Sequence, residues 1–191
     1  MKRFALATAV LALASATAFA QTSTWKSDAA HSEVDFSIKH LSISNVHGRF
    51  GKVNATIVYD EADVTKSTVN ATIDVTTVDT GEPQRDTHLK SPDFFDAANS
   101  PTATFASTGV VKSGSGLKVT GNLTLHGVTK PVVLDVEGPG PSVPGMDHKP
   151  HTGFSASTTI SRTAFNIGSK FPAAMVGDDV KLTIELEVVK Q

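Results

Sequence analysis

The stretch "VKLTIELEVV", residues 180–189, alternates apolar and polar side chains over most of its length. Leu182, Ile184 and Leu186 fall on one face, and lysine, threonine and glutamate residues fall on the other. A period of two residues is typical of a β-strand with one buried and one solvated face. The C-terminal end of the chain is therefore predicted to be an amphipathic strand.

Working back from this strand, the same alternation recurs along the chain. "KSGSGL" (112–117) and "HGVTKP" (126–131) predict tight connections, and the Pro- and Gly-rich residues 138–151 predict a mobile loop. Eight antiparallel strands remove their free edges best by closing into an up-and-down barrel, although a two-sheet sandwich would show the same periodicity. The other predicted strands are residues 33–39, 53–60, 67–78, 102–111, 117–125, 131–138 and 152–161.

The predicted inner face carries several small residues. An eight-stranded barrel encloses enough room either to be filled by side chains or to hold one small ligand. Small side chains favour the second reading, but they also suit a barrel that tapers, so both stay open. The residues concerned are Ala55, Ala71, Ala103, Gly121 and Ala156.

The N-terminus has the pattern of a secretory signal peptide. Lys2 and Arg3 precede an apolar run, and small residues follow up to Ala20. We expect cleavage after Ala20, export to the periplasm, and a single mature domain over residues 21–191. No later stretch is long and apolar enough to suggest an integral membrane protein.

Composition excludes several classes of site. The chain has no cysteine, so disulfides, thiolate metal sites and cysteine nucleophiles are ruled out. Its net charge of −2 argues against nucleic-acid binding, which usually needs a basic surface. The sequence also lacks the G-x-S-x-G and P-loop signatures. We therefore predict a protein that is not an enzyme.

The connector "RDTHLKSPDFFDAANSPTATF" (85–105) places two large rings in a polar segment. Short helical pieces are predicted near Arg85–Lys90 and Asp93–Ala98. If such a helix caps the open end of the barrel, one ring of Phe94 and Phe95 faces inward, where it excludes water and moves to admit a ligand. Simple plugging of the core explains the same pair equally well.

Histidine spacing suggests two further sites. Met146, His148 and His151 offer donors to copper or zinc, but no rigid element fixes them, and solvated loop histidines are the favoured reading. No metal site is assigned on this basis. His31, His40 and His47 could instead converge at one rim of the barrel, where hydrogen-bonding roles are favoured over catalytic ones.

Arg85, Asp86 and His88 form a potential polar cluster, which Arg162 could join from another strand. A structural ion pair that pins the connector to the barrel is the favoured reading. Binding of an anionic head group by Arg85 or Arg162 is the alternative.

Four longer segments resemble one protein family: "DAAHSEVDFSIKHLSISNVHGRF", "TVDTGEPQRDTHLKSPDFFDAANSPTATFAST", "VTGNLTLHGVTKPVVLDVEG" and "GFSASTTISRTAFNI". The chain is similar to the YceI-like family, exported bacterial proteins also described as polyisoprenoid-binding, from Trp25 to Val189. Asn166 departs from the family pattern, which usually has glycine there, and residues 139–150 are also unusual.

The resemblance implies a lipocalin-like, eight-stranded antiparallel barrel with a helical piece after the third strand. It also implies a long isoprenoid or other lipid in the lumen and no enzyme activity. Some members resemble partners of membrane-bound b-type cytochromes, and some form dimers. The leading hypothesis is thus a periplasmic carrier of an isoprenoid such as a quinone or a polyprenyl phosphate, with no other cofactor.

Under this hypothesis aromatic and aliphatic residues form the wall and lid of the lumen, and Arg85, His88 and Arg162 meet a polar head group. Two alternatives remain. One is an enzyme acting on such a lipid, although alternation places no charged residue on the inner face, and the other is a metal-handling protein. The predicted wall and lid residues are Phe36, Leu41, Phe50, Leu89, Phe94, Phe95, Phe105, Leu125, Phe154 and Phe165.

Overall fold

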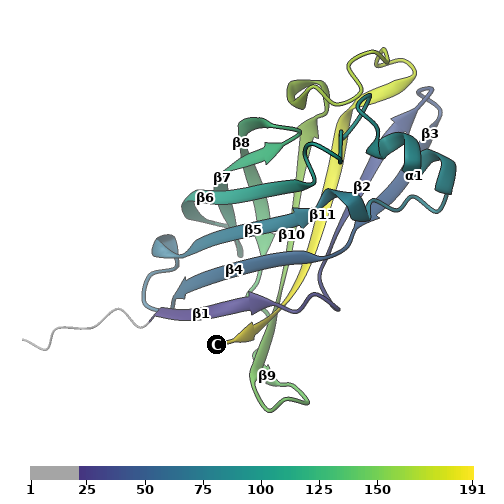
Figure 1. Ribbon diagram of the computed structural model, residues 1–191. Coiled ribbons are helices and arrows are strands. Elements are labelled where there is room, and N and C mark those ends of the chain that lie inside the picture. The colour runs from purple at the N-terminus through teal and green to yellow at the C-terminus, as the bar shows by residue number, and fades with distance from the viewer. Residues whose placement is uncertain (1–21) are drawn as a thin grey trace, which may run out of the picture.

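The structure is a computed structural model that describes residues 22–191 (Figure 1). The predicted signal peptide, residues 1–20, lies outside the described residues. Within this range, no helix has the length and apolar character that crossing a membrane requires.

Strands make up most of the described chain, and one α-helix and three single-turn 3₁₀ helices interrupt them. The helices are α1 (Pro83–Lys90), η1 (Val64–Lys66), η2 (Val75–Thr77) and η3 (Thr163–Phe165). The strands are β1 (Thr22–Ser27), β2 (Glu33–His40), β3 (Ser44–Phe50), β4 (Val53–Asp60), β5 (Thr68–Asp74), β6 (Thr102–Ser113), β7 (Gly116–Leu125), β8 (Val128–Glu137), β9 (Val143–Pro144), β10 (Pro150–Ser161) and β11 (Val176–Lys190).

Eight antiparallel strands close into a barrel, in the order β1-β4-β5-β6-β7-β8-β10-β11. The long strand β11 completes the ring, because residues 179–189 pair with β10 along one edge. Its other edge is divided between β2, which pairs with residues 176–185, and β1, which pairs with residues 188–190. The predicted barrel is confirmed, and the sandwich alternative is wrong.

The set of strands that closes the barrel differs from the predicted set. β1 and β3 were not predicted, and β2 lies outside the closed ring, in a hairpin with β3. β3 forms the end of the sheet order, and a single isolated bridge links Arg49 to Asp79. Residues 79–101, which include α1 and are called the connector below, fill the space between β3 and the start of β6 (Figure 1).

Helix α1 has clear local causes. The Glu82 side chain accepts a hydrogen bond from the Gln84 N–H, and Pro83 occupies the first turn, where its missing N–H has no partner to lose. Ser91 is extended because Pro92 follows it, and the helix ends there. The second helical piece predicted near residues 93–98 is wrong, because turns stabilised by hydrogen bonds back to α1 occupy this segment.

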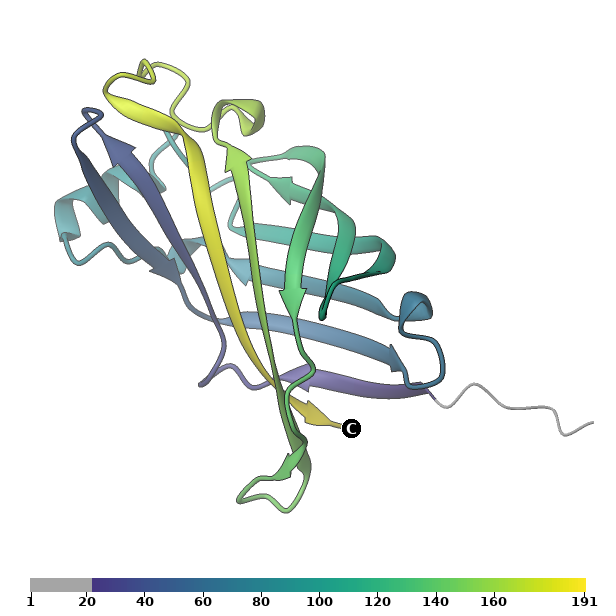
Figure 2. The ribbon, with the colours of Figure 1, turned by 180° about the vertical axis from the view of Figure 1, so that it is seen from behind.

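The predicted tight turns are confirmed between β6 and β7 and between β7 and β8. His126 and Gly127 both have positive φ, 52° and 72°. Positive φ at both central residues is what a two-residue type I′ turn requires, and this turn matches the right-handed twist of the strands that it joins. Residues 138–151 differ from the predicted mobile loop, because β9 pairs with Pro150 and His151 and extends β10 below the barrel (Figure 2). We call this lower end of the molecule the β9 end, and the opposite end the upper end.

The small inward residues have separate roles. A Cβ on Gly121 would lie 2.3 Å from Cζ of Phe105, so this ring fills the space that the glycine leaves. Ala55 is buried but borders neither cavity in the barrel interior. Ala71, Ala103 and Ala156, by contrast, line those cavities.

Candidate functional site: an apolar cavity in the barrel

The upper half of the barrel encloses a cavity of about 340 Å³. Side chains from β2, β3, β11 and the connector surround it, and apolar atoms dominate the lining. Nine of the predicted site residues border it: Phe36, Phe50, Arg85, His88, Leu89, Phe94, Phe95, Leu125 and Arg162.

A second, smaller cavity of about 130 Å³ lies in the lower half of the barrel. Phe105 and Phe154, two further predicted wall residues, border it. Its lining is almost wholly apolar. The two cavities share four wall residues, so together they follow the barrel interior; these are Val34, Ile73, Leu123 and Leu182.

The adjacent phenylalanines of the connector both point into the upper cavity, whereas the sequence predicted one. Phe95 meets Phe50 of β3 edge-on, with ring centroids 5.4 Å apart. Phe94 stacks on Phe171, from the segment before β11, at 5.0 Å. His88 of α1 packs edge-on against Phe94, also at 5.0 Å. The two rings therefore hold the connector against both sides of the upper end.

The cationic lining residue Arg85 is tied to the start of the connector. Its Nε donates to the Thr80 hydroxyl at 2.7 Å, and its Nη2 donates to the Thr80 carbonyl at 2.9 Å. Asp86 accepts from both the N–H and the hydroxyl of Thr80. The predicted Arg85–Asp86 cluster exists, but Thr80 links the two side chains in place of a direct ion pair.

The model of one family, described as the YceI-like domain, matches residues 25–188 of this chain. The chain belongs to the YceI-like family. UPF0312 protein ECA1782 of Pectobacterium atrosepticum is 41% identical over 187 residues, which cover 96% of this chain and 95% of that protein. Protein YceI of an Escherichia coli strain is 41% identical and covers 84% of this chain and 83% of its own length.

Solved structures of similar proteins agree on the fold. The Campylobacter jejuni YceI protein matches with a TM-score of 0.71 and 37% identity, over 81% of this chain and 90% of that one. Burkholderia cenocepacia BcnA matches with a TM-score of 0.73 and 28% identity, over 84% of this chain and 98% of that one. A domain from Saccharophagus degradans, described as polyisoprenoid-binding, shares the fold at 16% identity and a TM-score of 0.62, over 87% and 98%. Family and cavity together indicate a binding protein in general.

Arg162 of the YceI-like barrel has a role other than the predicted one. The residue is 3% exposed, and five hydrogen bonds use all five of its N–H groups. Every acceptor is a backbone carbonyl: those of Ile167, Gly168, Phe171, Val176 and Gly177, at 2.6–2.9 Å. Burial lowers the pKa of the guanidinium, and Asp178 opposes that shift. Its donors are thus committed to the segment before β11 and to the first two residues of that strand, which contradicts the head-group role.

Two other predicted wall residues lie away from the cavities. Leu41 sits in the β2–β3 turn with 47% of its surface exposed, because its positive φ of 50° places it at the tip of the turn. Phe165 is 2% exposed and packs in the core beside Ile167, bordering neither cavity. Phe171, which does line the upper cavity, was missed. Its only signal is a large ring in an irregular segment, as with the phenylalanine pair.

The predicted convergence of three histidines at one rim is wrong. His40 ends β2 at the upper end, where it pairs with Val176, and His47 lies on β3 nearby. His31 precedes β2 and lies beside Glu187, at the opposite end of that strand. His40 and His47 therefore lie at the upper end of the barrel, and His31 lies at the β9 end.

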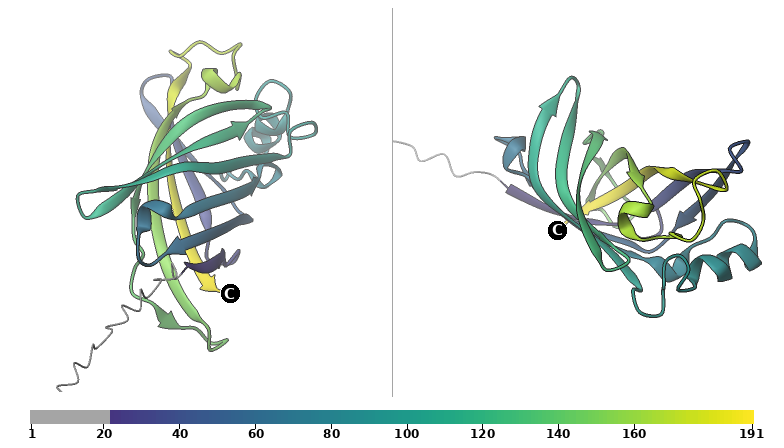
Figure 3. Two further views of the ribbon diagram at one scale, coloured as in Figure 1. Left: turned by 90° about the vertical axis from the view of Figure 1, so that its left-hand side faces the viewer. Right: turned by 90° about the horizontal axis from the view of Figure 1, so that it is seen from above.

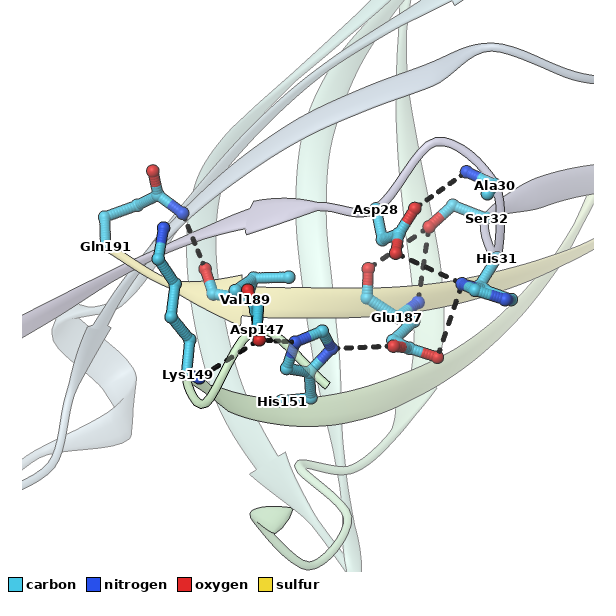
Figure 4. Close-up of polar contacts among 10 residues, drawn as sticks. All are labelled: Asp28, Ala30, His31, Ser32, Asp147, Lys149, His151, Glu187, Val189 and Gln191. Carbon is cyan, nitrogen blue, oxygen red and sulfur yellow. Dashed lines mark hydrogen bonds and ion pairs between the residues drawn. The ribbon is translucent and has the colours of Figure 1, made fainter. Parts of the chain in front are cut away.

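His151 lies in a polar cluster on the β9 end of the YceI-like barrel (Figure 4). Its Nδ1 is 2.7 Å from Glu187 Oε1, and its Nε2 is 3.0 Å from Asp147 Oδ1. Met146 is fully exposed, so the less favoured Met146–His148–His151 donor set is not assembled. Within residues 22–191, the group able to offer converging metal ligands is instead Asp28, His31 and Glu187, whose ligand atoms lie within 4.8 Å of one another.

The hydrogen bonds to Glu187 and Asp147 raise the pKa of His151 above its ordinary value of 6.5. Because the folded-state pKa is the higher one, this histidine adds stability below about pH 6.5 and loses its contribution as the pH rises through the folded-state value. We expect the difference in melting temperature between the unmodified chain and His151→Gln to be largest near pH 5.5 and to shrink towards pH 8.5. The exposed neighbour His148 supplies the control, His148→Gln, whose difference should stay small. A His151→Gln difference independent of pH would contradict the assignment.

Proposed function

We propose that this YceI-like protein is a periplasmic binding or carrier protein for a long-chain isoprenoid or related lipid held in the barrel. The apolar cavity of about 340 Å³ in the upper half of the barrel is the observation that carries the proposal. Small-molecule sites are usually apolar clefts of roughly 300–1,000 Å³ with a few polar groups that fix orientation. The smaller cavity below it adds apolar space for the far end of a chain.

The placement of the polar lining residues supports an amphiphilic ligand. Lys39, His40, Arg85 and His88 border the upper cavity, whereas the lining of the lower one has no charged residue. We propose that the hydrocarbon chain points down the barrel and that its polar head remains near the upper end. The described contacts of Arg85 use Nε and Nη2, which leaves Nη1 to meet an anionic or carbonyl head group.

The ligand class and the location are both parts of the proposal. The Saccharophagus degradans domain is described as polyisoprenoid-binding, and the shared fold motivates a test of the same class here. The signal-peptide pattern of residues 1–20 supports export. A membrane-bound b-type cytochrome partner and a homodimer, which the family resemblance implies for some members, stay predictions.

Catalysis on the lipid is the second candidate, and the geometry favours it less. Its best acid–base pair near the cavity is His88 and Asp93, with Nε2 and Oδ2 3.9 Å apart. Proton transfer partners are usually within about 2.6–3.2 Å. Both side chains are also substantially exposed, at 52% and 37%, and Lys170 donates a hydrogen bond to the same Asp93 carboxylate at 2.6 Å. Binding without turnover is the function that the site supports best.

Native mass spectrometry of the protein purified from the cell envelope tests this function directly. We expect a near-stoichiometric ligand that organic extraction identifies as an isoprenoid or similar lipid, or, for a protein purified empty, uptake of added geranylgeraniol. A protein that carries no lipid and takes up neither geranylgeraniol nor a quinone would overturn the proposal.

A further inference from the structure

Two neighbouring turns at the upper end of the barrel expose apolar side chains. In the β2–β3 turn Leu41 is 47% exposed and Ile43 is 81% exposed, and in the segment before β11 Met175 is 47% exposed. The Leu41 N–H donates to the Met175 carbonyl at 2.8 Å, which joins the two turns. Figure 3 shows the β2–β3 turn and the start of β11 side by side at this end of the barrel. Together with Met175, the exposed residues of that segment read "PAAM", residues 172–175. We call Leu41, Ile43 and residues 172–175 the rim patch.

The backbone of the β2–β3 turn is unusual for its residues. Leu41 and Ser42 have φ angles of 50° and 60°, and the Ile43 N–H closes the turn on the His40 carbonyl at 3.1 Å. Two consecutive left-handed residues are normally glycine, asparagine or aspartate. The turn instead presents a leucine and an isoleucine to solvent, where packing gives no reason for them. An unfavourable backbone that displays apolar side chains points to a contact made outside the chain.

Exposed basic charge beside the rim patch comes from Lys39. Residues 36–49 and 162–177 contain two lysines and two arginines, but Arg162 is buried and Arg49 is paired with Glu33 and Asp79, and Asp35, Asp178 and Asp179 flank these ranges. Lys170 is paired with Asp93 of the connector at 2.6 Å, whereas Lys39 is exposed beside the cavity. Apolar side chains bordered by basic ones are the arrangement that binds anionic lipid surfaces.

The rim patch is also continuous with the proposed ligand site. Met175 belongs to the rim patch and lines the upper cavity, and Lys39 and His40 line the same cavity from β2. A surface in contact with the rim patch would therefore lie at the mouth of the cavity. Exposed apolar residues elsewhere, such as Val143 and Met146, lie at the β9 end and border neither barrel cavity.

We propose that the rim patch docks the protein on an anionic lipid bilayer, so that an apolar ligand passes between bilayer and cavity without crossing water. This inference rests on the proposed function, because it supplies the step by which the ligand enters and leaves. Leu41, Ile43 and Met175 enter the interfacial layer, and Lys39 contacts the anionic head groups.

Flotation with vesicles of phosphatidylcholine, with and without phosphatidylglycerol, tests the docking. We expect the unmodified protein to float with the anionic vesicles, less at high salt. Ile43→Glu should lower the partition constant about tenfold, because it replaces an apolar side chain that enters the interface with a charged one. Val143→Glu, which adds the same charge at the β9 end, should leave binding unchanged. Both sites are exposed, so both variants should fold.

Uptake of geranylgeraniol from solution separates this inference from the proposed function. Ile43→Glu should keep that uptake, since Ile43 does not line the cavity, but should slow transfer from donor vesicles. Absence of vesicle binding by the unmodified protein, or equal losses in Ile43→Glu and Val143→Glu, would overturn the docking while leaving the carrier function intact. A dimer that Ile43→Glu dissociates, without vesicle binding, would likewise overturn it and assign the rim patch to a second copy of the chain.

Discussion

Replacement of Arg162 by alanine is expected to destabilise the fold by roughly 3–5 kcal/mol, among the largest effects that a single substitution in this chain could have. The side chain is 3% exposed, and its five N–H groups satisfy five backbone carbonyls between residues 167 and 177. Removal takes the side-chain donor from all five carbonyls at once. For a domain of this size we expect the melting temperature to fall by about 10 °C.

Two further variants test the reason for this loss. Arg162→Lys keeps the charge but supplies three donors from one point, so it should recover less than half of the stability. Arg49→Ala removes an arginine that is 59% exposed and paired with Glu33 and Asp79, and such surface pairs contribute about 1 kcal/mol or less. Urea unfolding of the three variants measures the difference. If the free energy of unfolding falls no further in Arg162→Ala than in Arg49→Ala, Arg162 does not hold the segment before β11 in place.

Ala103→Phe is expected to lower the affinity for an isoprenoid ligand by roughly 100- to 1,000-fold, because excluding one five-carbon unit from the cavity forfeits about 3–4 kcal/mol of burial. Ala103 lies on β6, is 4% exposed and points into the upper cavity. A phenyl ring placed there has no polar atom to satisfy and occupies space that is otherwise available to the ligand. Isothermal titration with geranylgeraniol measures the affinity, and a melting curve of the same variant measures its stability.

The neighbouring residue on the same strand provides the control. Thr104 faces solvent, so Thr104→Phe adds the same ring outside the barrel and should leave the affinity unchanged. If Ala103→Phe strains the wall and unfolds the chain, Ile73→Phe, at the boundary shared by the two cavities, makes the same test from β5. Unaltered affinity in folded Ala103→Phe would place the ligand outside the barrel.

Strands were predicted where their inward residues are large and apolar, and were missed where they are not. β1 buries Ser23 beside Trp25, whose indole N–H donates to the serine hydroxyl at 2.8 Å, so its pattern contains one apolar residue only. β3 contributes Gly48, and a Cβ there would lie 2.4 Å from Cζ of Phe36. Its inward position is thus filled by a ring from the neighbouring strand. A period of two is detected from the side chains of a single strand. A strand is therefore missed when an inward position is a glycine and the ring of a neighbouring strand fills the space beside it.

The candidate site was predictable in its aromatic wall and unpredictable in its polar groups. Phe36 follows from alternation and Phe95 from the exceptional pair in the connector, and Phe50 was predicted as a wall residue although its strand, β3, was not. The role of Arg162 depends on where carbonyls up to fifteen residues later in the chain turn inward, which no local pattern records. The expectation that no charged side chain borders the interior was also wrong, because it too was based on a local pattern alone.

Beside β3, the wall of the cavity is completed by the connector, residues 79–101, which belongs to no strand. Substitutions in a barrel strand affect closure, register and both faces of the sheet together. Residues 79–101 are exempt from most of these constraints, since α1 and the following turns form their own hydrogen bonds and reach the sheet mainly through a few rings and one bridge. The barrel can therefore stay constant while this one segment diversifies. We expect YceI-like proteins that share the fold but differ in cargo to diverge most in the length and ring content of this segment, as antibodies vary their loops over a constant framework.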